Sequence, residues 1–399
     1  MRRAYKYRLY PNREQESILE TTLEQLRLLY NFSLAERRNA WKNEHRNISY
    51  YDQQNALPDL KKRFPEYKNI HSQVLQDCLR RLDKAYDAFF RRVKEGGEPG
   101  YPRFKGKGRY HSFTYSQAGF KPCGNGKIRM SGIGDVNIVL HRPIPEDATI
   151  KTCTVSRNRA NQWFVSLAAE VPNAVPVGDG QITGIDLGLS NLITLSSGEV
   201  TEPPRFLRKA EKRLKRIQRR HSRKVKGSSN RTKHRLILGK AHVKVANQRH
   251  DFLNKLSRSL VDAHKGLAFE DLNIRGMVKN RHLAKSILDA SWGTLVRMTA
   301  HKAESAGKPF ILVPPQYTSQ DCSYCGHRVP KTLAERLHRC PHCGIQLDRD
   351  HNAAINIQLK ATAGIAGSHA WGDMDLYGGD TLPPQVQSTN QEAPSMRAG

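Results

Sequence analysis

The sequence predicts a mixed α/β protein that also contains a small β-barrel. Three observations support this fold class. Apolar residues recur at helical spacing in two long N-terminal segments, short alternating strands follow, and apolar strands alternate with helices in the second half. A chain of 399 residues is long enough for two or three domains, each with its own core.

The first hundred residues are predicted to be mainly helical. The segment "YKYRLYP" alternates and ends at a proline, which predicts a short strand, and Asn12 can cap the helix that follows. Leucines and isoleucines at helical spacing predict a helix over 13–42, and a second strong helix is expected over 71–96. A shorter helical piece is expected near 50–63.

Residues 112–172 carry a β pattern. Four runs are predicted to be strands: "GKIRMSG", "DVNIVLH", "TIKTCTVSR" and "QWFVSLAAEV". Glycine, proline and Asn-Gln pairs separate these short runs, as in a small barrel. The segment "NAVPVGDGQ" at 173–181 is then expected to be a linker.

The second half is predicted to alternate strands and helices. "ITGIDLGLSNLITLSSGEV" contains two apolar strands around a Ser-Asn turn, and "GLAFEDL" and "PFILVPP" are strands of a buried type. We expect helices on both sides of "KGSSN", over 287–307 and over 350–361. From 362 onward the composition predicts a disordered tail.

The charge of the chain predicts a polyanionic partner. Sixty-six Lys and Arg oppose 37 Asp and Glu, which gives a formal net charge of +29. Nucleic acid is the favoured partner, because each neutralised phosphate releases counterions. A membrane is disfavoured, since the sequence lacks a basic amphipathic helix, a run of ~18 apolar residues and an apolar signal segment. We therefore expect no membrane association and a cytoplasmic location.

Two basic segments are candidate nucleic-acid contacts. Residues 205–250 contain a single acid, Glu211, and such a run repels itself unless a polyanion lies against it. The segment "YPRFKGKGRYHSFTY" mixes cations with aromatic residues, which suits backbone contact and base stacking. The alternatives are a solvated charged helix and a polar loop that leads into the barrel. The candidate contacts are Arg103, Lys105, Lys107, Arg216, Arg219, Arg220, Arg223 and Lys224.

Four of the seven cysteines have the spacing of a metal site. Cys322 and Cys325 form one CxxC pair, and Cys340 and Cys343 form a second pair 14 residues later. This arrangement predicts one structural Zn²⁺ held by four thiolates, with redox-active or unbound cysteines as the alternative. Glycine follows each pair and permits a tight turn. His327, His338 and His342 lie nearby but are less suitable ligands, since four sulfurs already complete the shell. We assign no function to the scattered cysteines Cys78, Cys123 and Cys153.

Three acids lie at the ends of predicted core elements. Asp186 lies on the first strand of the second half, Glu270 ends a later strand, and Asp350 begins the last helix. In an RNase H-like fold this order brings three carboxylates to one edge of the sheet. Such a cluster suits two Mg²⁺ ions, or Mn²⁺, about 4 Å apart, which stabilise the attacking and leaving oxygens of phosphodiester cleavage.

Each acid also has a structural alternative. Asp186 could be a turn residue, and the strand "GIDLG" also opens actin-like ATPases. Asp348 and Asp350 could be helix N-caps, and Glu270 could be a solvated strand end.

Four blocks in a fixed order resemble the TnpB (OrfB) family of transposon-encoded proteins, which are related to type V CRISPR effectors. The blocks are "GIDLGLSNLITLSSG", "FEDLNIRGM", "PPQYTSQDCSYCG" and "CGIQLDRDHNAAINI". The start "YRLYPNREQ" and the segment "PRFKGK" are also similar to the family, so the resemblance covers about residues 1–360.

The resemblance implies an RNA-guided DNA endonuclease of a bacterium or archaeon, associated with the nucleoid. A guide RNA from the transposon end would pair with target DNA beside a short adjacent motif. A transposase encoded by the same element would be a further partner. The family's Mg²⁺-binding catalytic residues fall on Asp186, Glu270 and Asp350, which leaves Asp348 as a neighbour.

The resemblance also implies an architecture of five regions. They are a wedge-type β-barrel (1–11 and 106–176), a helical recognition domain (12–105), a RuvC/RNase H-like nuclease domain (177–316 and 344–361), a zinc-binding module (317–343) and a disordered tail (362–399).

Three alternative functions remain open. The chain could be an RNA-guided DNA binder or repressor without cleavage, although it keeps all three acids that such relatives have lost. It could be a DNA transposase that acts by strand transfer. An actin-like ATPase is disfavoured by the charge and by the absence of a later glycine-rich segment for adenosine.

Overall fold

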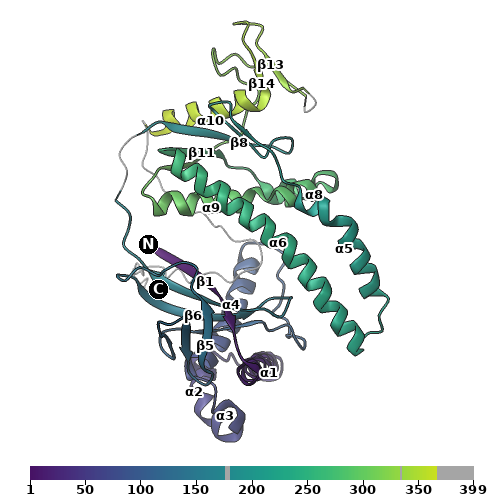
Figure 1. Cartoon of the computed structure of the whole chain (residues 1–399). Helices are drawn as coiled ribbons and strands as arrows, with labels where there is room; N and C mark the ends of the chain where they lie inside the picture. Colours follow the sequence, from purple (N-terminus) through teal and green to yellow (C-terminus); the bar gives the residue numbers. More distant parts are fainter. Residues whose placement is uncertain (176–179, 333–334, 366–399) are drawn as a thin grey trace, which may run out of the picture. The chain divides into compact units, whose positions relative to one another are not determined.

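The computed structural model describes residues 1–175, 180–332 and 335–365 (Figure 1). The chain divides into two compact units. The first unit contains 1–175 and 204–255, and the second contains the described parts of 176–203 and 256–399. No helix in the described ranges is long and apolar enough to cross a membrane.

The first unit contains a seven-stranded antiparallel sheet. Its strands are β1 (Arg2–Tyr10), β2 (Ser112–Tyr115), β3 (Phe120–Pro122), β4 (Lys127–Met130), β5 (Gly134–Val139), β6 (Thr149–Arg157) and β7 (Trp163–Glu170), in the order β2-β6-β7-β1-β5-β4-β3. Alternation explains their formation: on β1, Tyr5, Tyr7 and Leu9 are buried, and polar residues separate them. The predicted β region is confirmed.

Closure of this sheet into a barrel is not shown. Among the described residues, no strand pairing joins β2 to β3, the two ends of the row. The sheet nevertheless curls, because only four residues connect β2 to β3. The rings of Tyr115 and Phe120 lie 6.3 Å apart, and the Tyr115 hydroxyl donates to the carbonyl of Ser131 at 2.8 Å.

Helices supply the rest of the first core. They are α1 (Arg13–Glu44), α2 (Tyr50–Asn55), α3 (Leu57–Arg63), the 3-10 turn η1 (Pro65–Tyr67) and α4 (Ser72–Lys94). Asn12 begins α1 with a reciprocal capping box to Gln15, as its position predicted. The buried leucines of α1 and α4 pack in one cluster with the inward-facing residues of the sheet.

The basic segment 205–250 forms most of a helical hairpin. The hairpin consists of α5 (Phe206–Ser222) and α6 (Ser229–Ala263), and the boundary between the two units falls within α6. Arg231 holds the turn between the two helices by donating to the carbonyl of Lys224 at 2.6 Å.

The second unit contains a mixed five-stranded sheet. Its strands are β8 (Ile182–Leu187), β9 (Ile193–Leu195), β10 (Val200–Thr201), β11 (Gly266–Glu270) and β12 (Phe310–Val313), in the order β10-β9-β8-β11-β12. β8, β11 and β12 are parallel, and β9 is antiparallel to both of its neighbours. The helix α10 (Arg349–Ile365) covers one face and α9 (Trp292–Ser305) covers the other (Figure 1).

Shorter elements complete this unit: α7 (Ile274–Met277), α8 (Arg281–Ala290), β13 (Leu337–Arg339) and β14 (Gln346–Asp348). The last two pair as an antiparallel hairpin that the sequence did not predict.

Two predicted boundaries were wrong. The helix expected over 287–307 is broken at Ser291, whose φ of 56° is left-handed and ends α8. The break lets Trp292 become buried and donate its indole N–H to Gly188 at 3.3 Å. α10 continues through Ile365, so the predicted tail cannot begin at 362, and its remainder, 366–399, lies outside the described residues. Part of the predicted linker, 176–179, lies outside them too.

Candidate metal centres

A close approach between β8 and α10 positions the first candidate site. A Cβ atom added to Gly184 would lie 2.0 Å from the carbonyl oxygen of Ala354 and 2.6 Å from the backbone nitrogen of Gln358. Only glycine therefore allows α10 to pack at this distance. Asp186 lies two residues after Gly184 on the same face of β8, and Asp350 lies one turn before Ala354 on α10.

Strand register brings the second acid to the same edge. Ile185 of β8 pairs with Phe269 of the parallel strand β11, so the next residues, Asp186 and Glu270, are level at the carboxyl ends of both strands. Asp186, Glu270 and Asp350 are each at most 9% exposed. The structure thus places the three predicted acids in one buried region, and their catalytic role stays a prediction.

The electrostatics of this region show that the acids interact. Burial raises the pKa of Asp186 well above its usual value, and the neighbouring Glu270 and Asp350 raise it further. Burial also raises the pKa of Glu270, although a hydrogen bond from Thr318 and the charge of Lys360 oppose the rise. Bound cations would lower the free-energy cost of ionising these buried, mutually repelling carboxylates.

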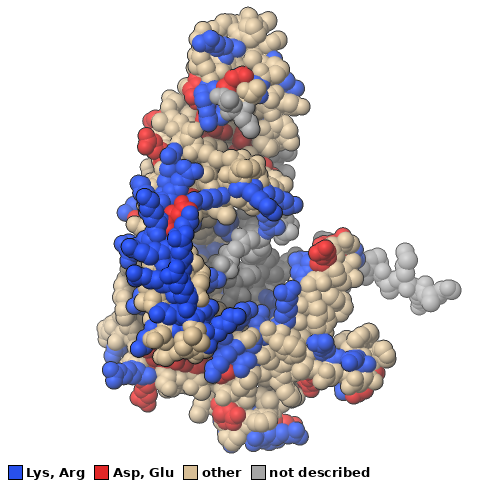
Figure 2. Space-filling view, turned by 90° about the vertical axis from the view of Figure 1, so that its right-hand side faces the viewer, with Lys and Arg blue, Asp and Glu red and all other residues tan. Residues whose placement is uncertain are grey.

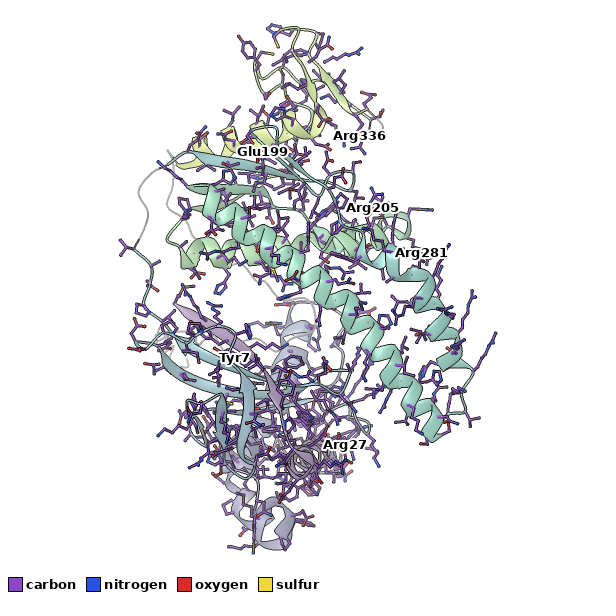
Figure 3. The ribbon with its side chains drawn as sticks, viewed as in Figure 1. Tyr7, Arg27, Glu199, Arg205, Arg281 and Arg336 are labelled. Atoms are coloured by element: carbon purple, nitrogen blue, oxygen red, sulfur yellow. The ribbon has the colours of Figure 1, made fainter. Side chains whose placement is uncertain are left out.

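Asp350 is paired with arginines in this structure. Its Oδ1 accepts from Arg349 Nη2 at 2.9 Å and from Arg349 Nε at 3.1 Å. Nη1 of Arg336, a residue labelled in Figure 3, lies 3.5 Å from Oδ2 of Asp350. Asp348 accepts from the backbone N–H groups of Asp350 and His351, at 2.9 and 3.2 Å, so it caps α10.

The donor set fits hard cations, because it consists of carboxylate oxygens, the ligands that Mg²⁺ and Mn²⁺ prefer. The oxygens of the three carboxylates lie farther apart than the sulfur atoms of the four cysteines described next. Within the described ranges, the four cysteines are the one group of three or more potential ligands whose ligand atoms all lie within 4.8 Å of one another.

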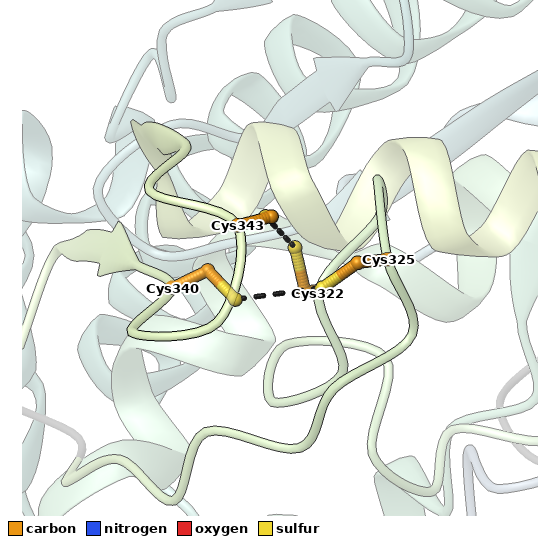
Figure 4. A group of neighbouring side chains, drawn as sticks. All are labelled: Cys322, Cys325, Cys340 and Cys343. Carbon is orange, nitrogen blue, oxygen red and sulfur yellow. Dashed lines mark hydrogen bonds between the residues drawn. The ribbon is translucent and has the colours of Figure 1, made fainter.

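The four cysteines form the second candidate centre (Figure 4). Cys322 Sγ lies 3.6 Å from Cys343 Sγ, and Cys325 Sγ lies 3.5 Å from Cys340 Sγ. Four thiolates around one ion with bonds of about 2.3 Å have similar separations of roughly 3.8 Å. The predicted four-cysteine cluster is confirmed, and it suggests a zinc site.

The backbone turns tightly after each cysteine pair. The glycines after the two pairs, Gly326 and Gly344, have φ values of 74° and 76°, which other residues rarely adopt. Burial acts to raise the pKa of Cys340, but hydrogen bonds from the backbone N–H groups of Cys343 and His342, together with those from the Cys325 and Cys343 side chains, lower that pKa to about 6.

The histidines of the module take no part in the cluster. His338 is buried beside Lys331, and the exposed rings of His327 and His342 stack with centroids 5.6 Å apart.

Sequence reasoning missed a set of polar residues between the two centres. Thr318 lies beside Glu270, and α10 carries Asn352 and Asn356, both buried. Two asparagines four residues apart, with only two alanines and an isoleucine between them, were the available signal, because buried amides need hydrogen-bond partners.

The predicted nucleic-acid contacts lie on two exposed segments of the first unit. Figure 2 shows a dense band of Lys and Arg on the face that carries the α5–α6 hairpin. Residues 205–250 hold 18 Lys and Arg, and their one acid, Glu211, pairs with Lys215 at 2.9 Å. Of the contacts predicted there, Lys224 is half-buried. The other four are exposed: Arg216, Arg219, Arg220 and Arg223.

The other predicted contacts lie between α4 and β2. Arg103 and Lys107 are exposed, whereas Lys105 is half-buried. Asn31 fixes the backbone of Lys105 through hydrogen bonds of 2.7 and 2.9 Å, and the Lys105 ammonium lies 5.3 Å from the ring centroid of Tyr30.

Three family models match the chain. The OrfB model, described as "Probable transposase", matches residues 166–281, a "Cas12f1-like, TNB domain" matches 292–357, and a "Helix-turn-helix domain" matches 1–46. The last description differs from the structure, in which β1 and the single continuous helix α1 span almost all of that range.

Curated relatives match over nearly the whole chain. A protein of Streptomyces pristinaespiralis named "Putative RNA-guided DNA endonuclease" is 36% identical over 403 residues, which cover 100% of this chain and 96% of the relative. A protein of Escherichia coli K12 with the same description is 31% identical and covers 91% of this chain and 93% of its own length.

A solved structure has the same fold. The structure titled as a Cas12f1-sgRNA-target DNA complex matches with a TM-score of 0.56 at 16% identity, covering 87% of this chain and 83% of that chain. At this identity the likeness concerns the fold alone.

Proposed function

The chain belongs to the TnpB (OrfB) family, and we propose that it is an RNA-guided DNA endonuclease whose catalytic residues are Asp186, Glu270 and Asp350. One observation carries the proposal: β8, β11 and α10 bring these acids to one buried edge of a mixed sheet. The order of the acids along the chain matches the family pattern.

The nuclease domain is of the RuvC/RNase H-like type. This assignment is supported by the strand order β10-β9-β8-β11-β12. In this order β8, β9 and β10 pair antiparallel, and β11 and β12 continue the sheet parallel to β8. The strands of this sheet, α10 and the described part of the zinc module, 317–343, belong to the second unit, whereas residues 204–255 of the proposed domain group with the first unit.

The carboxylates would hold two Mg²⁺ ions, or Mn²⁺. Bound there, such ions would supply charge stabilisation to the attacking and leaving oxygens of a DNA phosphodiester. The chain's own contribution is to keep Asp186 and Glu270 level, to place Asp350 across from them, and to bury all three. Zn²⁺ at the four cysteines is structural, because four thiolates fill its tetrahedral shell.

The partners are a guide RNA from the transposon end and the target DNA, with a transposase of the same element as a further candidate. Residues 205–250 of the α5–α6 hairpin support the nucleic-acid assignment, since 18 cations against one acid favour counterion release on a polyanion.

The basic hairpin gives a direct test of binding. Replacing Arg216, Arg219 and Arg220 by Gln should lower affinity and flatten its salt dependence by ~0.9 log units for each duplex phosphate that is no longer neutralised. Filter binding between low and moderate salt measures the slope. Arg129→Gln is the control, because Arg129 is already paired with Asp135 at 2.7 and 2.9 Å. An unchanged slope in the triple variant would remove the hairpin from the interface.

The decisive experiment copurifies the chain with RNA expressed from its transposon end. The complex is challenged with a plasmid library in Mg²⁺, with Asp186→Ala beside it. Cleavage that requires both the RNA and Asp186 supports the proposal. Binding without cleavage would make the protein a guided binder.

A transposase that acts by strand transfer is the second candidate, because the matching family model carries that description. Joined strands that form without RNA would favour it over the endonuclease.

A further inference from the structure

We propose that Thr318 is a positioning residue that orients Glu270 and couples the four-cysteine module to the carboxylate site. This inference rests on the function proposed above, because it assigns Glu270 to a cation site. It concerns three features of the second unit: a buried hydroxyl, a polar stripe on α10 and the first cysteine pair.

The hydroxyl of Thr318 is placed to fix one oxygen of Glu270. Thr318 is 3% exposed, and its Oγ1 donates to Glu270 Oε1. The carbonyl of Pro315 lies 3.1 Å from the same hydroxyl, but a hydroxyl has one proton and the carboxylate is the stronger acceptor. Fixing Oε1 leaves Oε2 as the ligand atom with a defined direction. Polar groups behind metal ligands act in this way.

Thr318 is itself held by a polar stripe on α10. Asn352, Asn356 and Lys360 recur every four residues and therefore lie on one face of the helix. All three bind the backbone of 316–323, and Lys360 Nζ donates to the carbonyl of Gln316 at 2.6 Å. The segment that carries Thr318 is thus attached to three successive turns of α10, the helix whose first turn contains Asp350.

The two asparagines connect Thr318 to the cysteines. Asn356 Nδ2 donates to the carbonyls of Thr318 and Asp321, at 2.8 and 2.6 Å. Asn352 Nδ2 donates to the same carbonyl of Asp321 at 2.8 Å, and its Oδ1 accepts from the N–H of Ser323 at 3.0 Å. Both lone pairs of the Asp321 carbonyl are therefore used. Asp321 and Ser323 flank the first metal-ligating cysteine.

This network gives the two centres a shared structural element. Ordering of Cys322 and its neighbours by Zn²⁺ fixes the carbonyls that Asn352 and Asn356 hold, and Asn356 fixes Thr318 against Glu270. A coupling between two binding sites is reciprocal, so a cation at the carboxylates should strengthen zinc retention by the same factor as zinc strengthens cation binding.

The first test compares the Mg²⁺ affinity of three single variants of the full chain. Thr318→Val removes the hydroxyl at nearly constant volume, Thr318→Ser keeps it, and Thr362→Val makes the same change at an exposed site on α10. The Mg²⁺ midpoint is measured twice: from the rise in melting temperature of the chain alone, and from cleavage by the chain with its RNA.

We expect Thr318→Val to raise both Mg²⁺ midpoints by about 10-fold or more, with a maximal rate close to wild type at saturating Mg²⁺. Thr318→Ser should stay within about twofold of wild type, and Thr362→Val should not differ from it. A Thr318→Val protein that melts earlier but keeps the wild-type Mg²⁺ midpoint would overturn the inference, because that result indicates a purely structural role.

The second test measures zinc release to a colorimetric chelator with and without Mg²⁺, a hard ion that does not compete for thiolates. Mg²⁺ should slow release from the wild type and leave release from Thr318→Val unchanged. Equal release with and without Mg²⁺ in a wild type that does bind Mg²⁺ would overturn the coupling.

Failure of the proposed function has a different signature. A wild type that shows neither a Mg²⁺-dependent melting shift nor guided cleavage removes the cation site itself. A Mg²⁺-responsive wild type matched by Thr318→Val removes only the role of Thr318.

Discussion

The four cysteines and the three carboxylates are both sets of potential metal ligands in the second unit, but they assemble by different means. Two short turns gather the cysteines, and their sulfur atoms come within 4.8 Å of one another. The carboxylates come from β8, β11 and α10, and depend on strand register and on one close helix–strand contact. Local spacing makes the first site recognisable from a motif, whereas the second exists only when the whole unit is folded.

Cysteine removal should have the largest effect. Cys322→Ser is expected to lose the metal and with it on the order of 10 kcal/mol of local folding free energy. Zinc content per chain and limited proteolysis measure the result, and cuts should concentrate in 317–343. Cys123→Ser, at a partly exposed cysteine of the first unit, is the matched control. A variant that keeps one zinc per chain would show that three sulfurs are enough.

A methyl group at Gly184 should disrupt the carboxylate site alone. The added Cβ of Gly184→Ala would lie 2.0 Å from the Ala354 carbonyl, so α10 must move, at an expected cost of about 3 kcal/mol in unfolding free energy. Cleavage should fall while zinc is retained. Gly364→Ala is the control, because its added Cβ meets nothing within 4 Å. Wild-type cleavage by Gly184→Ala would refute this dependence on close packing.

The buried acids should make the cation-free protein sensitive to pH. Since the pKa of Asp186 is raised in the folded state, the folded protein binds more protons than the unfolded chain. Its contribution to stability is complete below pH ~4, near the unfolded pKa, and is lost as pH rises through the raised folded pKa. Relative to Asp186→Asn, the wild type should therefore lose melting temperature between acidic and alkaline pH.

Mg²⁺ at alkaline pH should restore the wild type and leave Asp186→Asn little changed. Parallel melting curves for the two proteins would contradict the raised pKa. The four-cysteine site offers a contrast, because its thiolates are expected to be neutralised by their own ion.

The smallest effect is expected at Asp348. It caps α10, so Asp348→Ala should cost about 1 kcal/mol of stability and leave guided cleavage within a few-fold of wild type. Asp350→Ala should abolish cleavage, although the two residues share one motif. Chemical denaturation and plasmid cleavage together distinguish a cap from a ligand. Loss of cleavage in Asp348→Ala without loss of stability would reverse the assignment.

The sequence was informative where local pattern decides structure. Helical periodicity predicted α1 and α4, and cysteine spacing predicted the metal cluster. Alternation predicted β1, β4, β5, β6 and β7 of the first unit, but not the short strands β2 and β3. The order of acids predicted that three carboxylates would share an edge, but only because a family fold supplied the register.

Other features depend on packing that no local pattern carries. The break at Ser291 follows from the burial of Trp292, and nothing in the helical periodicity marks it. The pairing of Arg349 with Asp350 and the contact of Thr318 with Glu270 likewise need the folded unit, because they depend on side-chain directions and on segment positions that the sequence does not give.

The junction between β14 and α10 sets a rule for chain length. β14 ends at Asp348 and α10 begins at Arg349, so no loop separates the cysteine module from the helix that carries Asp350. One inserted or deleted residue between Cys343 and Asp350 would turn the helix by about 100° relative to the hairpin. Engineered insertions, tags or chimeric junctions therefore have to keep the six residues between Cys343 and Asp350 unchanged in number, whatever they alter elsewhere in the module.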